Sequence, residues 1–204
     1  MRRSLLGLLT VVAIAGLLVM TGCERTEVLR VVSINRGNTL RVDIADFLAY
    51  FDPIDSEYVT IYQHMPDSVE VVLQYVEIGA GLPTWTPYQV TINQATVTFT
   101  SKMSVGDEPL VYTKAVVPLD QTVMSDKTGK TKTTFFMTAI PAVWKQLNLL
   151  DYMIEPPEYD LVDLARAQFD FSGYDPISDR DVKATGYLQV EFGNLYDDLS
   201  RFGK

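Results

Sequence analysis

The sequence is almost without cysteine and histidine. One cysteine, Cys23, and one histidine, His64, occur in 204 residues. A disulfide within the chain is therefore excluded, and so is a zinc site built from several histidine and cysteine side chains. A serine–histidine–aspartate triad would have to use His64, and no Gly-x-Ser-x-Gly segment accompanies it. Glycine-rich loops that bind phosphates or dinucleotides are also missing, so the sequence predicts a protein that is not an enzyme.

Positive charge is scarce as well. The chain has 17 Lys and Arg against 26 Asp and Glu, and its formal net charge at pH 7 is -9. Nucleic acid requires a basic surface, so we expect no nucleic-acid partner. The acidic balance also disfavours a domain that lies flat on anionic lipid. Two carboxylates need no fixed spacing to act as a hydrolytic pair, so a hydrolase of that kind stays open as the least favoured alternative.

The one long apolar run lies at the N-terminus. It follows Arg2 and Arg3, covers residues 5–19 and is succeeded by Met20-Thr21-Gly22-Cys23. A positive start, an apolar helical run and small residues before a cleavage point are the parts of a secretory signal peptide, here residues 1–22. The alternative is a transmembrane anchor, but the run is short for a bilayer core of about 30 Å and no basic cluster follows it.

These residues resemble the lipobox of bacterial lipoproteins, with Met20 where the family usually has leucine. The resemblance implies that the Cys23 sulfur receives a diacylglyceryl group, that residues 1–22 are removed and that the new amine is acylated. Two or more acyl chains give stable anchoring to a membrane. By the same resemblance, Glu24 rather than aspartate after the cysteine favours an outer-membrane location facing the periplasm over the inner membrane.

The rest of the chain predicts a short lipidated tether, residues 23–27, and a single all-β domain over residues 28–204. About nine short amphipathic segments, separated by turn residues, are typical of an antiparallel β-sandwich. An immunoglobulin-like arrangement is one form of it, and a closed barrel is the alternative. Alternation is clearest in residues 182–192 and in residues 69–78, where Val69, Val71, Leu73 and Tyr75 should point inward.

Several local expectations follow from turn and breaker residues. Residues 28–34 and 39–44 predict a hairpin around a turn that contains Gly37. Residues 45–57 are expected to be irregular, and residues 125–130 to form a second hairpin tip. A change of register near Asn93 predicts a β-bulge. Residues 141–150 predict the only short helix, with Trp144, Leu147 and Leu150 at helical spacing.

An acidic segment between the last two predicted strands is a candidate metal site. It contains Asp170, Asp175, Asp179 and Asp181. Ca²⁺ binds six to eight oxygens, often from carboxylates on a loop. A solvated turn is the alternative interpretation. A second acidic group, Asp52, Asp55 and Glu57, could add ligands only if it lay at the same end of the fold.

An aromatic loop and a lysine-rich tip are candidates for partner binding. Trp85 and Tyr88 lie in a loop rich in proline and glycine, and such side chains make good protein contacts when they are exposed. The alternative is a loop that folds its tryptophan onto the sandwich edge. The lysine-rich tip contains Lys127, Lys130 and Lys132. These side chains would suit anionic lipid headgroups or an acidic partner, and the alternative is that they only keep the tip soluble.

The sequence therefore predicts a membrane-anchored, non-enzymatic binding or structural module that engages another component of the cell envelope. A Ca²⁺-binding or small-ligand-binding module that uses residues 170–181 is the alternative. No cofactor other than Ca²⁺ is expected.

Overall fold

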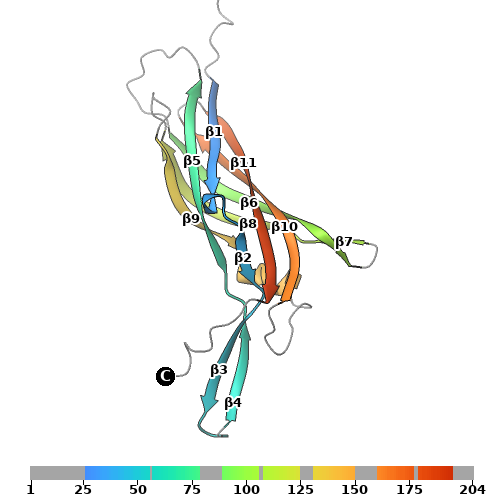
Figure 1. Ribbon diagram of the computed structural model, residues 1–204. Helices are drawn as coiled ribbons and strands as arrows, with labels where there is room; N and C mark the ends of the chain where they lie inside the picture. The colour runs from blue at the N-terminus through green and yellow to red at the C-terminus, as the bar shows by residue number, and fades with distance from the viewer. Residues whose placement is uncertain are drawn as a thin grey trace, which may run out of the picture.

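The computed structural model describes residues 26–55, 57–78, 89–105, 108–124, 131–149, 160–176 and 179–194. They form an all-β fold of two sheets, a separate two-stranded hairpin and one short α-helix (Figure 1). The predicted fold class is confirmed. The predicted signal helix lies outside the described residues, and no helix within them is long and apolar enough to span a membrane.

The smaller sheet has three antiparallel strands in the order β1-β5-β9. Their bounds are β1 (Thr26–Ile34), β5 (Asp67–Ile78) and β9 (Thr133–Ile140). Alternate residues of β5 are buried, as the sequence pattern predicted: Val69, Val71, Leu73 and Tyr75.

The larger sheet has the order β2-β11-β10-β6-β7, and β8 pairs with the other part of the long strand β6. The bounds are β2 (Leu40–Asp43), β6 (Gln89–Val105), β7 (Glu108–Val111), β8 (Ala115–Met124), β10 (Asp160–Asp175) and β11 (Arg180–Asn194). The β2–β11 pair is parallel, and every other pair is antiparallel.

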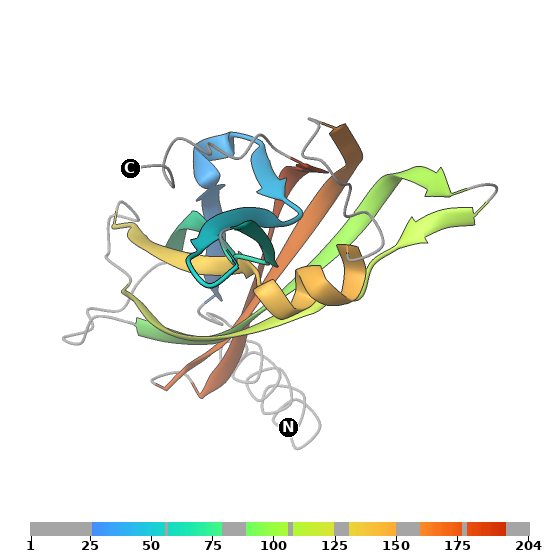
Figure 2. The same cartoon turned by 90° about the horizontal axis from the view of Figure 1, so that it is seen from below.

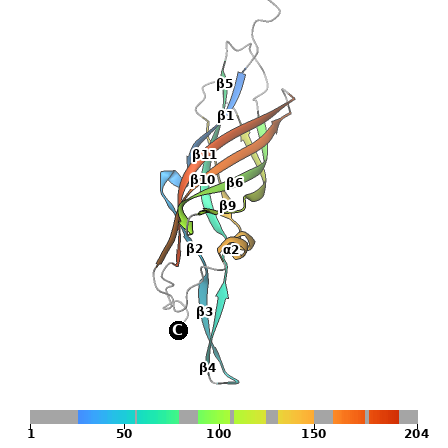
Figure 3. The ribbon, with the colours of Figure 1, turned by 90° about the vertical axis from the view of Figure 1, so that its right-hand side faces the viewer.

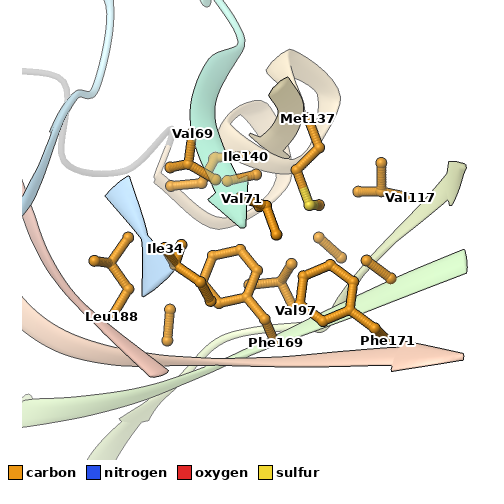
Figure 4. Packing of buried hydrophobic residues seen from close by; sticks show 14 of the residues in the cluster. Ile34, Val69, Val71, Val97, Val117, Met137, Ile140, Phe169, Phe171 and Leu188 are labelled. Atoms are coloured by element: carbon orange, nitrogen blue, oxygen red, sulfur yellow. The ribbon is translucent and has the colours of Figure 1, made fainter. Parts of the chain in front are cut away.

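The inner faces of the two sheets form one apolar core. Figure 4 shows Phe169 and Phe171 of the larger sheet facing Val71 and Met137 of the smaller one. The sheets also approach each other at both edges of the smaller sheet, where β1 lies against β11 and β9 against β8. At Gly186 a Cβ atom would lie 2.7 Å from Val31 Cγ1. Glycine therefore allows β1 to cross closely over β11.

The predicted hairpin of residues 28–34 and 39–44 is wrong. The first segment pairs with β5 in one sheet, and the second pairs with β11 in the other. Three consecutive residues between them have left-handed φ angles: 49° at Asn35, 54° at Arg36 and 80° at Gly37. This turn carries the chain across the core instead of folding it back onto itself.

The prediction that residues 45–57 are irregular is also wrong. They contain β3 (Asp46–Asp52), which pairs in register with β4 (Glu57–Gln63). Pro53 lies in the turn between the two strands. This hairpin forms a sheet of its own, separate from the two sheets of the body.

Other local predictions have mixed outcomes. The bulge near Asn93 is confirmed, because the pairing of β6 with both β8 and β10 shifts there. Residues 115–124 and 133–140 do not pair as a hairpin: β8 belongs to the larger sheet and β9 to the smaller. The short helix is confirmed as α2 (Ala142–Leu149), but its buried residues are Trp144, Lys145 and Leu149, whereas Leu147 is 75% exposed. Leu150 lies outside the described residues.

Candidate interaction surface

The β3–β4 hairpin projects from the end of the body where β2 ends and β5 begins (Figure 1). Figure 3, turned by 90°, shows the same projection from the side. The two strands pair with each other over seven residue pairs and belong to neither of the other sheets. An isolated two-stranded hairpin is only marginally stable in water. The segment therefore receives little of the packing that stabilises the body.

The hairpin sequence is apolar on both faces. Successive residues of a strand belong to opposite faces of a sheet, and directly paired residues share a face. One face has the pairs Phe47–Tyr62 and Phe51–Tyr58, and the other has Leu48–Ile61 and Tyr50–Val59. The body strands differ, because they alternate buried and exposed positions: β11, for example, places Lys183, Thr185 and Gln189 outward. Neither face of the hairpin has such a polar pattern.

The tip of the hairpin is exposed and acidic. Ile54, in the turn, is 88% exposed. The carboxylate of Asp52 accepts a hydrogen bond from the Ile54 backbone N–H at 2.8 Å, which fixes the turn. Acidic residues border both strands: Asp46, Asp52, Asp55 and Glu57. No lysine or arginine occurs between Arg41 and Lys102. The acidic residues of the hairpin therefore have no basic residue near them in the sequence.

His64 closes the base of the hairpin. Its Nδ1 lies 2.8 Å from the carbonyl oxygen of Ile44, in the short segment that joins β2 to β3. A carbonyl only accepts, so Nδ1 must carry the proton and donate it. The Ile44 N–H in turn donates to the carbonyl of Gly193 at 3.0 Å. The single histidine therefore ties the two chain segments at the hairpin base to each other and to β11.

Lys145 of α2 binds both strands from which the hairpin emerges. Its Nζ donates to the backbone carbonyl of Asp43 at 2.6 Å and lies 2.7 Å from the Asp67 carboxylate. Lys145 is 1% exposed. A buried ammonium is tolerated only with such partners. Sequence reasoning missed this residue, because nothing in its local pattern distinguishes it from an exposed helix lysine.

Aromatic side chains hold α2 in place (Figure 2 shows the helix from below). The Trp144 ring centroid lies 4.6 Å from Phe99, 5.5 Å from Tyr112 and 5.8 Å from Phe192. The indole N–H donates to the Thr113 carbonyl at 2.6 Å. Such a tryptophan contributes a large buried area and a hydrogen bond together. The helix is thus a fixed support beside the hairpin base.

The outer side of α2 carries two exposed apolar residues, Val143 and Leu147. Val143 is 65% exposed and Leu147 is 75% exposed. Residues four apart on a helix are neighbours on one face. Figure 3 shows α2 next to the point where the hairpin leaves the body. This end of the molecule therefore combines an acidic, apolar hairpin with an exposed apolar strip.

The residues predicted to bind Ca²⁺ are mostly in strands and not in a loop. Asp170 and Asp175 belong to β10 and Asp181 to β11, whereas Asp179 lies in the turn with φ of 56°. The strands extend further than predicted because Gly173 lets β10 pass close to β6. A Cβ atom at Gly173 would lie 2.4 Å from the Thr91 carbonyl oxygen.

Each of these aspartates has its own surroundings. Asp170 accepts a hydrogen bond from the Thr185 hydroxyl at 2.6 Å, and buried Asp175 accepts one from Tyr75 at 2.6 Å. Asp179 accepts from the Tyr174 hydroxyl, a bond that raises the pKa of that phenol. Within the described ranges, no three acidic, histidine or cysteine side chains gather into a cation site. Calcium binding therefore stays a prediction, and the described residues provide no cluster of ligands that supports it.

The two fully buried aspartates do not form a catalytic pair. Asp175 is bonded to Tyr75, and Asp163 accepts a hydrogen bond from the Tyr112 hydroxyl at 3.0 Å. Both lie on β10, where a separation of 12 positions spans roughly 40 Å. Hydrolytic carboxylate pairs lie about 5 to 10 Å apart. These two carboxylates therefore act as separate interior hydrogen-bond acceptors.

Several predicted residues lie outside the described part of the chain: Cys23, Trp85, Tyr88, Lys127 and Lys130. Lys132 is described and is exposed just before β9. Their predicted roles stay predictions.

Comparison with protein-family models, with curated proteins and with solved structures finds no match to this chain. Any functional conclusion must therefore come from its own residues and their placement.

Proposed function

We propose that the protein is a membrane-anchored lipoprotein of the bacterial cell envelope that binds another envelope component without catalysing a reaction. The lipobox-like segment ending at Cys23 supports the anchor. The observation that carries the proposal is that only Glu24 and Arg25 separate Cys23 from the start of β1 at Thr26. If Cys23 carries lipid, this two-residue tether holds the domain close to the membrane.

The direction of β5 supports a division of roles between the two ends of the fold. Thr26 pairs with Ile78 at one end of β5, and the hairpin joins β5 at Asp67, the other end. The 12 residues of β5 and the seven of β4 together extend roughly 60 Å along the molecule. Lipid on Cys23 would thus anchor the end opposite the hairpin, and the hairpin would face away from that membrane.

A binding role agrees with the described polar side chains. His64 donates to a backbone carbonyl, and the buried aspartates on β10 are far apart. Lys145 is paired at the hairpin base. These groups hold the fold together. Among the exposed apolar residues, Ile54, Val143 and Leu147 lie at the end away from the proposed anchor.

Fatty-acid labelling of Cys23→Ala tests the anchor. Cells are fed a fatty acid carrying a clickable alkyne, and label and membrane fractionation of the protein are measured. The unchanged chain should be labelled and recovered with membranes, whereas Cys23→Ala should lose the label and keep its signal segment. Thr21→Ala is the matched control, since it retains a small residue before the cysteine and should be labelled normally. Equal labelling of Cys23→Ala and the unchanged chain would refute the lipoprotein proposal.

A further inference from the structure

We propose that the β3–β4 hairpin is a docking element that enters an apolar cleft of another protein, and that lysine and arginine side chains border this cleft. The inference rests on the proposed function, because the anchor decides which end of the fold faces away from the membrane. It adds the binding element and the chemistry of the partner.

The first argument is the distribution of apolar residues. The register places aromatic or aliphatic residues on both faces of the hairpin, and the hairpin belongs to neither sheet of the body. Packing against one surface would bury only one of these faces. A cleft that closes around the hairpin would bury both, and the backbone of either outer strand edge could also pair with the partner. The exposed Ile54 would then lie deepest in the cleft.

The second argument is charge. Asp46, Asp52, Asp55 and Glu57 lie at the ends of the two strands, and the nearest basic residues in sequence are Arg41 and Lys102. Complementary charge around an interface guides association and excludes wrong partners. Two hairpins in contact would oppose acid to acid, and an anionic lipid surface would repel the hairpin. The charge pattern therefore selects a basic protein surface.

The third argument is the support at the base. His64 and Lys145 fasten the strands on both sides of the hairpin to each other and to α2. Trp144 fixes α2 to the larger sheet. The hairpin is thereby presented in one direction, which lowers the entropy that binding must remove. The exposed Val143 and Leu147 can extend the contact beside the base.

Site-specific photocrosslinking in the native cells tests the inference on the full lipidated chain. A photoreactive phenylalanine analogue replaces Ile54 at the hairpin tip, and in a matched chain it replaces Val111 of β7, which is 82% exposed. We expect an adduct with one other protein from position 54 and none with that protein from position 111. Mass spectrometry of the adduct should place the linked residue in an apolar cleft bordered by basic side chains.

Charge reversal adds a second readout to the same experiment. Asp55→Lys with Glu57→Lys should lower the adduct yield from position 54 by about tenfold. Added positive charge at two exposed positions off the hairpin, Asp120→Lys with Thr122→Lys, should leave the yield unchanged. Circular dichroism checks that both double variants keep the β-fold.

Four outcomes would overturn the inference: an adduct of two copies of this chain, an adduct with lipid, equal adducts from positions 54 and 111, or no adduct from position 54. Membrane fractionation is measured on the same cells. A chain that is found in membranes but gives no adduct contradicts the docking element alone. A chain that is missing from membranes contradicts the anchor.

Discussion

The body and the hairpin are both antiparallel β-structure, but they use their apolar residues differently. In the body one face of each sheet is buried in the common core, where residues such as Phe169 and Val190 are 0% exposed. In the hairpin both faces are apolar, and the turn residue Ile54 is 88% exposed. The first pattern is explained by stability, because burial of apolar side chains in a core stabilises the fold. The second pattern belongs to a hairpin outside both sheets of the body, and it is the basis of the docking element proposed above.

Hydrogen exchange should show the largest difference between the two regions. The amides of β3 and β4 should exchange at least about a thousandfold faster than those of β6 and β10, because the hairpin opens without unfolding the core. Exchange measured by mass spectrometry or NMR at neutral pH provides the comparison. Protection in β3 and β4 as high as in β10 would mean that the hairpin is a cooperative part of the body.

Two substitutions on α2 compare a buried and an exposed residue of the same helix. Trp144→Ala should lower the free energy of unfolding by about 3 to 5 kcal/mol, because it removes contacts with Phe99, Tyr112 and Phe192. Leu147→Ala should change it by less than about 0.5 kcal/mol. Urea unfolding measures both. Similar values for the two variants would contradict the assigned orientation of the helix.

Lys145→Ala tests the joint between the two regions. It leaves the Asp67 carboxylate and the Asp43 carbonyl without their ammonium partner, so we expect a loss of about 3 kcal/mol in the free energy of unfolding. Lys183→Ala, at an exposed position of β11, is the matched control and should have little effect. A loss no greater than that of Lys183→Ala would show that the buried pair does not hold the joint.

The ion pair between Arg36 and Glu70 should give the smallest effect. Arg36 Nε and one terminal nitrogen contact the two Glu70 oxygens at 3.0 and 2.9 Å. The hydrogen bonds from Arg36 lower the pKa of Glu70. Because the folded pKa is depressed, the pair stabilises the protein above the unfolded pKa of about 4.3, and this contribution is lost as pH falls through the folded pKa.

Glu70→Gln should therefore be slightly less stable than the unchanged protein at about pH 7, and the difference should disappear as pH falls through the depressed folded pKa of Glu70. Urea unfolding at several pH values measures the difference. Because Arg36 is largely exposed, added salt should also reduce it. A difference that grows on acidification would contradict the depressed pKa.

Regular alternation made much of the body predictable. The inward residues of β5, the bulge near Asn93 and the helix at residues 142–149 all followed from local sequence pattern. Strand β3 was missed because a segment that is apolar on both faces has no period of two.

Long-range arrangements were not predictable from local pattern. The left-handed φ angles at Asn35 and Arg36 place β1 and β2 in different sheets, although their sequences suit a hairpin. The partners of Lys145, Asp43 and Asp67, lie 102 and 78 residues away in sequence, so no spacing rule indicates them. The acidic segment of residues 170–181 suggested a loop, but the pairing of β10 with β11 continues to Asp175 and Arg180.

The antiparallel pairing of β1 and β5 also determines how the fold would respond to force. A membrane that holds the chain before Thr26 and a partner that holds the hairpin would pull β1 and β5 in opposite directions along their length. The hydrogen bonds between antiparallel strands are perpendicular to the strands, so this tension shears all of them at once instead of opening them one by one. The hydrogen bonds between β1 and β5 would then be the main resistance to unfolding when the membrane and the partner pull on the protein.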